Sequence, residues 1–221
     1  MKAATTRSLK SLNMVWLVSV ALVDLFIVVA LVAPEWLQAE SLTRAGIGRV
    51  AASIAMPTLV LLMVNLLPHD VKAMLVYWKP LGNLPGSQAF TKHGPSDRRI
   101  DMGALKRNVG VLPKDPNEQN AKWYKLYRQV SSETEVAEAH RLFLLYRDMA
   151  AVSLLLGMTV PLGLLYAGTS IPAVAGTAAL FLVQYLATAV GARWSGVRFV
   201  CSVLAVHSAK KVTASKAATT S

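Results

Sequence analysis

The sequence has a single cysteine, Cys201, so the chain cannot form a disulfide bond within itself. Histidine is scarce too, and the spacing of the four histidines places no two of them on neighbouring turns of one helix as metal ligands. No cysteine or carboxylate cluster completes a zinc site. We therefore expect no metal centre and no cofactor.

The motifs of the common enzyme classes are also missing. The chain contains no G-x-S-x-G, H-E-x-x-H or phosphate-loop pattern. Two neighbouring pairs near predicted membrane boundaries, His69 with Asp70 and Arg147 with Asp148, have the right residue types for catalysis. Each pair is more simply explained by charges that close a helix end. The sequence therefore predicts a protein without enzymatic activity.

Long apolar runs are what the chain has in abundance, since 54% of its residues are hydrophobic and only 16% are charged. The mean hydropathy of +0.43 is above that of an ordinary soluble domain. Four largely apolar runs reach the length of about 18 residues that crosses a bilayer. They are Met14–Ala33, Val50–Leu67, Met149–Ala167 and Ile171–Ala192. The first run, with 20 residues, is too long for the apolar region of a signal peptide, so we expect an uncleaved helix.

Basic residues flank these runs unevenly. The N-terminal tail has three basic residues and no acid, residues 68–148 have thirteen basic and nine acidic ones, and the chain after Ala192 has five basic and no acidic ones. The positive-inside rule then places both termini and the long segment in the cytoplasm, with the chain crossing the membrane several times. Topology and contact with anionic lipids explain the net charge of +11, so nucleic-acid binding is not expected.

The predicted fold is an all-α membrane protein with four transmembrane helices, arranged as two hairpins around a small, mainly helical cytosolic insertion. The predicted parts are a cytosolic tail (1–13), the first transmembrane hairpin (14–67), a basic cytosolic segment with a helical hairpin (68–148), the second transmembrane hairpin (149–192) and a basic cytosolic tail (193–221). The small, polar residues 209–221 at its end are predicted to be disordered.

The cytosolic insertion is predicted to begin with irregular structure. Residues 79–99 contain three prolines and three glycines, which favour an ordered loop or an extended segment over a long helix. Asp101 can then cap a short helix that continues to about Asn108, with Gly110 as its terminator.

A longer helix is predicted directly after Asp115, because Pro116 suits the first helical position and Glu118 completes a capping box. Another helix is predicted from about Glu133, and nothing interrupts it before Gly157, inside the third apolar run. We expect these two helices to pack as a hairpin that couples a bound ligand or partner to the membrane. A hairpin packed only for stability would show the same pattern. The residues assigned to coupling are Trp123, Tyr127, His140 and Phe143.

Basic residues also gather in the loop and the short helix of the insertion. The residues assigned to ligand binding are Lys92, Arg98, Arg99, Lys106 and Arg107. With the glycines nearby, they could cradle a nucleotide-type anionic ligand. They could instead lie against lipid headgroups, and Arg98 and Arg99 could pair with the neighbouring Asp97 and Asp101.

Few strongly polar residues occur inside the predicted spans. Those assigned to a pore or to interhelical contacts are Asp24, Thr58, Asn65 and Gln184. A charged aspartate at the bilayer centre costs roughly 2.5–3.5 kcal/mol, so Asp24 must face protein, be neutral or be hydrated. No polar stripe accompanies it along its helix. It can bond to Thr58, Thr159 or Gln184, or form a ring of acids in a homo-oligomeric pore.

The stretches "WYKLYRQ" and "AHRLFLLYRDMAAVSLLL" give the chain a resemblance to uncharacterised small bacterial inner-membrane proteins. In architecture it also resembles the four-helix membrane effectors of antiphage (antiviral) defence systems that nucleotides activate. That resemblance implies that a cytosolic ligand causes permeabilisation of the membrane. We predict a homo-oligomeric, ligand- or partner-gated effector that forms a pore or disrupts the membrane. The alternative is a non-conducting scaffold that recruits a cytosolic partner.

Overall fold

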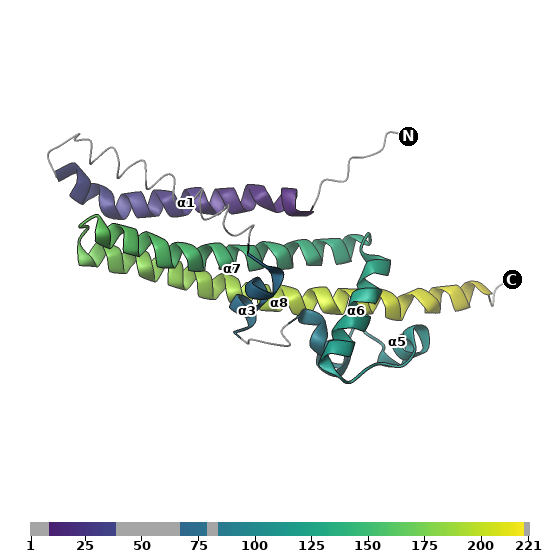
Figure 1. Cartoon of the computed structure of the whole chain (residues 1–221). Coiled ribbons are helices and arrows are strands. Elements are labelled where there is room, and N and C mark those ends of the chain that lie inside the picture. Colours follow the sequence, from purple (N-terminus) through teal and green to yellow (C-terminus); the bar gives the residue numbers. More distant parts are fainter. Residues whose placement is uncertain (1–8, 39–66, 79–83, 219–221) are drawn as a thin grey trace, which may run out of the picture. The chain divides into compact units, whose positions relative to one another are not determined.

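The computed structural model describes residues 9–38, 67–78 and 84–218, and every element within these ranges is a helix (Figure 1). In chain order they are α1 (Leu9–Gln38), α3 (His69–Tyr77), the 3₁₀ helix η1 (Pro85–Gln88), the π-helix η2 (Ala89–His93), α4 (Gly94–Ser96), α5 (Met102–Val109), α6 (Pro116–Val130), α7 (Thr134–Tyr166) and α8 (Ile171–Ala218). The predicted all-α class is confirmed for this part of the chain.

Three of the described helices contain segments that are long and apolar enough to cross a membrane. These segments are Asn13–Val32, Thr134–Tyr166 and Ile171–Ala209. They include or overlap the first, third and fourth of the predicted runs. The second predicted run, 50–67, lies outside the described residues apart from Leu67, and it includes Thr58 and Asn65.

Helix α8 is much longer than the predicted fourth span, since its 48 residues continue from Ile171 to Ala218. The prediction of a disordered end over 209–221 is therefore wrong as far as Ala218. Two features of the sequence explain the long helix. No proline follows Pro172. Apolar residues recur at helical spacing beyond Ala192, and Phe199, Val200, Val203 and Leu204 are all buried.

The chain divides into two compact units, and α7 and α8 each contribute to both. The first, which we call the apolar unit, comprises residues 1–76 and 144–190, and the second, the polar unit, comprises 77–143 and 191–221. The core of the apolar unit consists of aliphatic side chains of α1, α7 and α8 around one ring. Its buried residues are Val28, Val32, Ala151, Val152, Leu156, Leu164 and Phe181.

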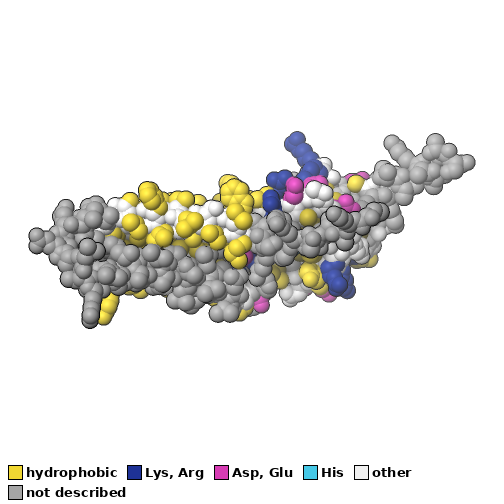
Figure 2. Space-filling view, turned by 90° about the horizontal axis from the view of Figure 1, so that it is seen from above, with side chains coloured by type: hydrophobic (Ala, Val, Ile, Leu, Met, Phe, Trp, Pro, Cys, Tyr) yellow, Lys and Arg dark blue, Asp and Glu magenta, His cyan; other side chains and the backbone are white. Residues whose placement is uncertain are grey.

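The long helices of the apolar unit also expose large hydrophobic side chains, and Figure 2 shows hydrophobic side chains gathered along the described surface. They include Val15, Leu22, Phe26, Met158, Leu162 and Val183. Such a surface is costly in water and suits contact with lipid.

In the polar unit, the predicted helix caps are present. The Asp101 carboxylate accepts a hydrogen bond from the Ala104 backbone N–H at 2.9 Å, and Gly110 ends α5 at a φ of 79°. The Asp115 carboxylate accepts from the backbone N–H groups of Asn117 and Glu118 at 2.9 and 3.1 Å, and α6 begins at Pro116. Helix α7 begins at Thr134, one residue from the predicted start. The local cap signals therefore determine where α5 and α6 begin.

The segment before α5 differs from the prediction, because the described residues 85–96 form the short helical turns η1, η2 and α4 instead of an extended loop. The buried side chain of Gln119 in α6 explains the difference. Its Oε1 accepts from the backbone N–H groups of Phe90 and Thr91 at 3.0 and 3.3 Å, and its Nε2 donates to the carbonyl of Lys114 at 2.8 Å. One distant side chain thus satisfies two backbone N–H groups of the π-helix.

Candidate functional site

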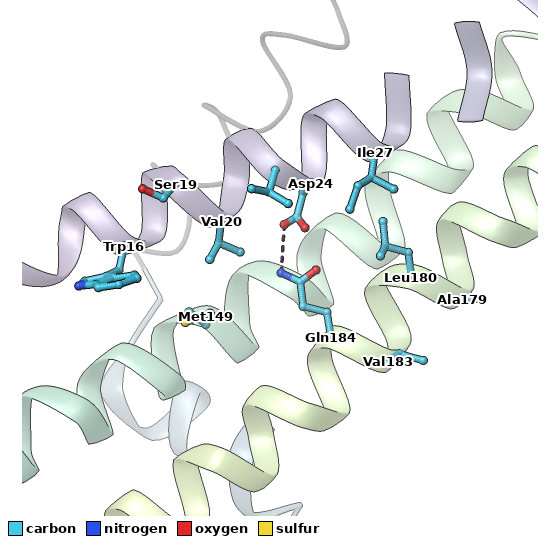
Figure 3. A pocket seen from close by; sticks show the side chains of 11 residues that line it. Trp16, Ser19, Val20, Asp24, Ile27, Met149, Ala179, Leu180, Val183 and Gln184 are labelled. Carbon is cyan, nitrogen blue, oxygen red and sulfur yellow. Dashed lines mark hydrogen bonds between the residues drawn. The ribbon is translucent and has the colours of Figure 1, made fainter. Parts of the chain in front are cut away.

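Asp24 and Gln184 meet inside the apolar unit (Figure 3). Asp24 is 95% buried on α1, and its Oδ2 accepts a hydrogen bond of 3.0 Å from Nε2 of Gln184 on α8. Gln184 is one of the three partners that the sequence suggested. The bond satisfies polar atoms of two membrane-length helices in apolar surroundings and so joins these helices.

A groove of about 790 Å³ surrounds this pair in the apolar unit (Figure 3). Its lining comes mostly from α1 and α8, with one side chain from α7: Trp16, Ser19, Val20, Val23, Asp24, Ile27, Met149, Ala179, Leu180, Val183 and Gln184. The Ser19 hydroxyl donates to the backbone carbonyl of Val15. The lining is therefore almost entirely apolar, and within one copy it presents no row of polar groups to an ion.

A buried ion triad joins α3 to α7 in the same unit. Nζ of Lys72 lies 3.1 Å from Oδ1 of Asp148, and Arg147 donates to the same oxygen through Nη2 at 3.0 Å and Nε at 3.2 Å. The three side chains are at most 10% exposed. The sequence singled out Arg147 and Asp148 but missed Lys72, which is 76 residues away from Asp148.

The polar unit contains an aromatic cluster centred on Phe199 of α8. The four residues that the sequence assigned to coupling all contact this ring. Ring centroids lie 5.1 Å away for Trp123, 5.1 Å for Tyr127, 4.6 Å for His140 and 6.3 Å for Phe143. We call these five residues the Phe199 cluster. Because Trp123 and Tyr127 belong to α6 and His140 and Phe143 to α7, the cluster joins three helices.

A hydrogen bond within the Phe199 cluster fixes the orientation of two of its members. The Tyr127 hydroxyl and Nδ1 of His140 lie 3.0 Å apart. Burial, with a smaller effect from Tyr124, raises the pKa of Tyr127 above its ordinary value. This hydrogen bond fixes the relative orientation of Tyr127 and His140, whereas the other contacts in the cluster are apolar.

Arg99 holds together a polar contact that we call the Arg99 clamp, formed by Asp97, Arg99, Glu135 and Ser202. Nη2 of Arg99 lies 2.8 Å from Oδ2 of Asp97, and Nη1 lies 2.8 Å from Oε1 of Glu135 on α7. The hydroxyl of Ser202 on α8 donates to that same glutamate oxygen at 3.0 Å. The clamp therefore connects the loop before α5 to both long helices. Hydrogen bonds from Arg99 also lower the pKa of Asp97 to about 2.

The clamp separates Arg99 from the other residues assigned to ligand binding. Lys92, Arg98, Lys106 and Arg107 are exposed in the polar unit. Arg98 forms no ion pair with the part of the chain that the structure describes. Arg107 contributes to lowering the pKa of Asp101, which mainly follows from the hydrogen bond of the Ala104 backbone N–H. All five cations are therefore exposed, but Arg99 differs from the other four because it joins the loop to Glu135 of α7.

Sequence reasoning missed four residues that the structure shows to be central, namely Lys72, Gln119, Phe199 and Ser202. Each contacts a partner far away in the sequence, so no local spacing could identify it. Within residues 9–38, 67–78 and 84–218, no group of three or more histidine, cysteine, aspartate or glutamate side chains could hold a metal ion. No protein-family model, curated protein or solved structure matches the chain.

Proposed function

We propose that the protein is a gated membrane effector, in which a ligand or partner bound by the polar unit acts on the membrane through α7 and α8. The Phe199 cluster carries this proposal, because it joins α6 to both helices. Both helices continue from the cluster into apolar segments of membrane length. A displacement of α6 would therefore act on two membrane helices at once. In response, several copies of the chain form a pore in the bacterial inner membrane or disrupt that membrane.

The ligand of this effector is anionic, either of the nucleotide type or an acidic surface of a cytosolic protein. The four exposed cations Lys92, Arg98, Lys106 and Arg107 support this assignment. Arg98 is next in sequence to Arg99, which bonds to Glu135 of α7. An anion bound at Arg98 would thus lie one residue away from a contact with the long helices.

Membrane potential in living bacteria tests the gated effector. Cells that express the native chain or Phe199→Ala are loaded with a potential-sensitive dye and followed during induction and then during phage infection. We expect depolarisation with the native chain and its loss with Phe199→Ala, because the mutation removes the ring that four others contact. The matched control is Val111→Ala, which truncates an 80% exposed side chain of the polar unit.

Membrane fractionation accompanies the dye measurement, so that failure of insertion is distinguished from failure of gating. A native chain that inserts and never depolarises the cells under either condition would exclude the effector. A Phe199→Ala chain that inserts and depolarises like the native one would exclude coupling through the cluster.

The same dye measurement tests the ligand contact. Arg98→Glu is expected to reduce the response and to leave insertion unchanged, because the exposed side chain supports no described contact. Arg128→Glu is the matched control, since it reverses an exposed cation on α6. Equal responses from the two variants would remove Arg98 from the binding surface.

A non-conducting scaffold is the second candidate, and the Asp24–Gln184 hydrogen bond favours it. This bond uses the acid to join α1 to α8, so it gives Asp24 a role without any pore. Asp24→Asn keeps a side chain that can bond to Gln184, whereas Asp24→Leu removes it. A scaffold predicts that only the leucine variant lowers the melting temperature in detergent. A pore predicts that the asparagine variant changes cation preference.

A further inference from the structure

The exposed face of α8 changes character at Trp194. Before it, the large exposed side chains are apolar, as at Ile171, Leu182 and Val183, which are 66%, 56% and 66% exposed. Trp194 is 74% exposed. From residue 195 to 208, Arg198 is the one exposed residue in this described stretch. The exposed apolar side chains of α8 therefore end at Trp194, and an exposed arginine follows one helical turn later.

The length of α8 locates this change relative to a bilayer. The 23 residue steps from Ile171 to Trp194 correspond to about 35 Å at the rise of an α-helix. The hydrocarbon core of a bilayer is about 30 Å thick. With Ile171 at one boundary of the core, Trp194 lies a few Å beyond the other, where tryptophan side chains concentrate in membrane proteins. Arg198 follows about 6 Å further along the helix, at headgroup level.

A second indole of the polar unit lies beside this part of α8. Trp78 is 53% exposed, and the guanidinium carbon of Arg193 lies 3.7 Å from the centroid of its ring. This cation–π contact holds the charge of Arg193, the residue before Trp194, against the Trp78 ring. We call Trp78, Arg193, Trp194 and Arg198 the interfacial patch. It combines two exposed indoles with the exposed guanidinium of Arg198, whereas Nη2 of Arg193 is buried.

We propose that the interfacial patch binds the headgroup of an anionic phospholipid. Indole rings favour the boundary between hydrocarbon and water, and the exposed guanidinium of Arg198 can hold phosphate oxygens through paired N–H donors. A cytosolic protein fits less well, because Trp194 and Arg198 lie about one bilayer thickness along α8 from Ile171, at the level of the lipid headgroups. This lipid site depends on a membrane crossing by α8 and not on any gating, so a chain that never depolarises cells would leave it unaffected.

Tryptophan fluorescence in vesicles tests the position of the patch. The full chain, with Trp194 as its only tryptophan through Trp16→Phe, Trp36→Phe, Trp78→Phe and Trp123→Phe, is reconstituted with lipids brominated near the headgroup or near the chain end. We expect stronger quenching by bromine near the headgroup. A chain with Trp123 alone is the control, because that side chain is only 5% exposed. Quenching of Trp194 by aqueous iodide but not by either lipid would overturn the proposal, and so would protection from all three quenchers.

Lipid retention by the otherwise native chain tests the chemistry without removing any tryptophan. Detergent-purified Arg198→Gln is expected to bind phosphatidylglycerol about fivefold more weakly than the native chain, since one basic residue near an anionic surface contributes roughly 1 kcal/mol. Binding of phosphatidylcholine should not change. Arg128→Gln, which neutralises an exposed arginine of α6, should bind phosphatidylglycerol as the native chain does. Equal binding by Arg198→Gln and Arg128→Gln would overturn the proposal.

Discussion

The two units of the chain place charged side chains in different surroundings. In the apolar unit, charged contacts lie away from water, as in the ion triad around Asp148, whose side chains are at most 10% exposed. In the polar unit, the Arg99 clamp is open to water, since the side chains of Arg99 and Glu135 are 48% and 49% exposed. Water can solvate an exposed charge whose partner is lost, but it cannot do so for a buried one. Single substitutions should therefore have larger effects in the apolar unit.

The apolar parts of the two units differ as well. The core of the apolar unit is aliphatic apart from Phe181, whereas the Phe199 cluster consists of aromatic rings and an imidazole. Ring contacts fix the angle between neighbours as well as their distance. The same two helices, α7 and α8, thus have adaptable packing along one part of their length and directional packing along the other.

The largest expected effect is that of Asp148→Ala in the apolar unit. Both Lys72 and Arg147 bond to the Asp148 carboxylate, so the substitution removes this negative charge from beside two buried cations. Breaking a buried ion pair on one side costs about 3–5 kcal/mol. We expect little monodisperse protein after detergent extraction and a strongly lowered melting temperature. Asp70→Ala, which removes an exposed acid of α3, should resemble the native chain. Similar melting temperatures for both variants would contradict the comparison between the units.

Two glycine substitutions, one in each unit, should change the melting temperature by an intermediate amount and in opposite directions. A Cβ atom at Gly196 in the polar unit would lie 2.5 Å from the Tyr77 hydroxyl and 3.2 Å from the Phe143 ring. Overpacking of this kind costs about 1–3 kcal/mol. A Cβ atom at Gly163 in α7 would meet nothing within 4 Å. Gly196→Ala should therefore lower the melting temperature, and Gly163→Ala should keep or raise it. A reversed order would show that directional packing does not distinguish the polar unit.

The smallest expected effect is a dependence on pH in the Arg99 clamp. Arg99 lowers the pKa of Asp97 from 3.8 to about 2, so this contact stabilises the fold above the higher value and is lost as the pH falls through the lower one. For an exposed pair the contribution is roughly 0.2–1 kcal/mol. Asp97→Asn should therefore melt below the native chain at about pH 6, and the difference should shrink as the pH falls through about 2 and vanish by about pH 1. A difference in melting temperature that is constant across this range would contradict the assignment.

Local patterns predicted the local structure well. The caps at Asp101 and Asp115 and the start of α7 all follow from residues within one or two helical turns. Three of the four apolar runs correspond to described helices of membrane length, because hydrophobic length is itself a local property.

Contacts between distant segments could not be predicted in the same way. Phe199 is one of several apolar residues in a helix whose extension beyond Ala192 was not expected, and nothing near it in sequence distinguishes it. The short helical turns of residues 85–96 were predicted as a loop, since the pattern of prolines and glycines does not include Gln119. Polar partners for Asp24 could be narrowed to three residues because membrane spans contain so few of them.

The Gln119 side chain has a consequence for how the backbone exchanges hydrogen with water. Its single oxygen accepts from the amides of both Phe90 and Thr91, so one opening event would release both protons. Deuterium uptake at these two amides should therefore be slow and should rise together. Within the segment 79–99, which is rich in proline and glycine, these two amides would then exchange hydrogen in a single cooperative opening.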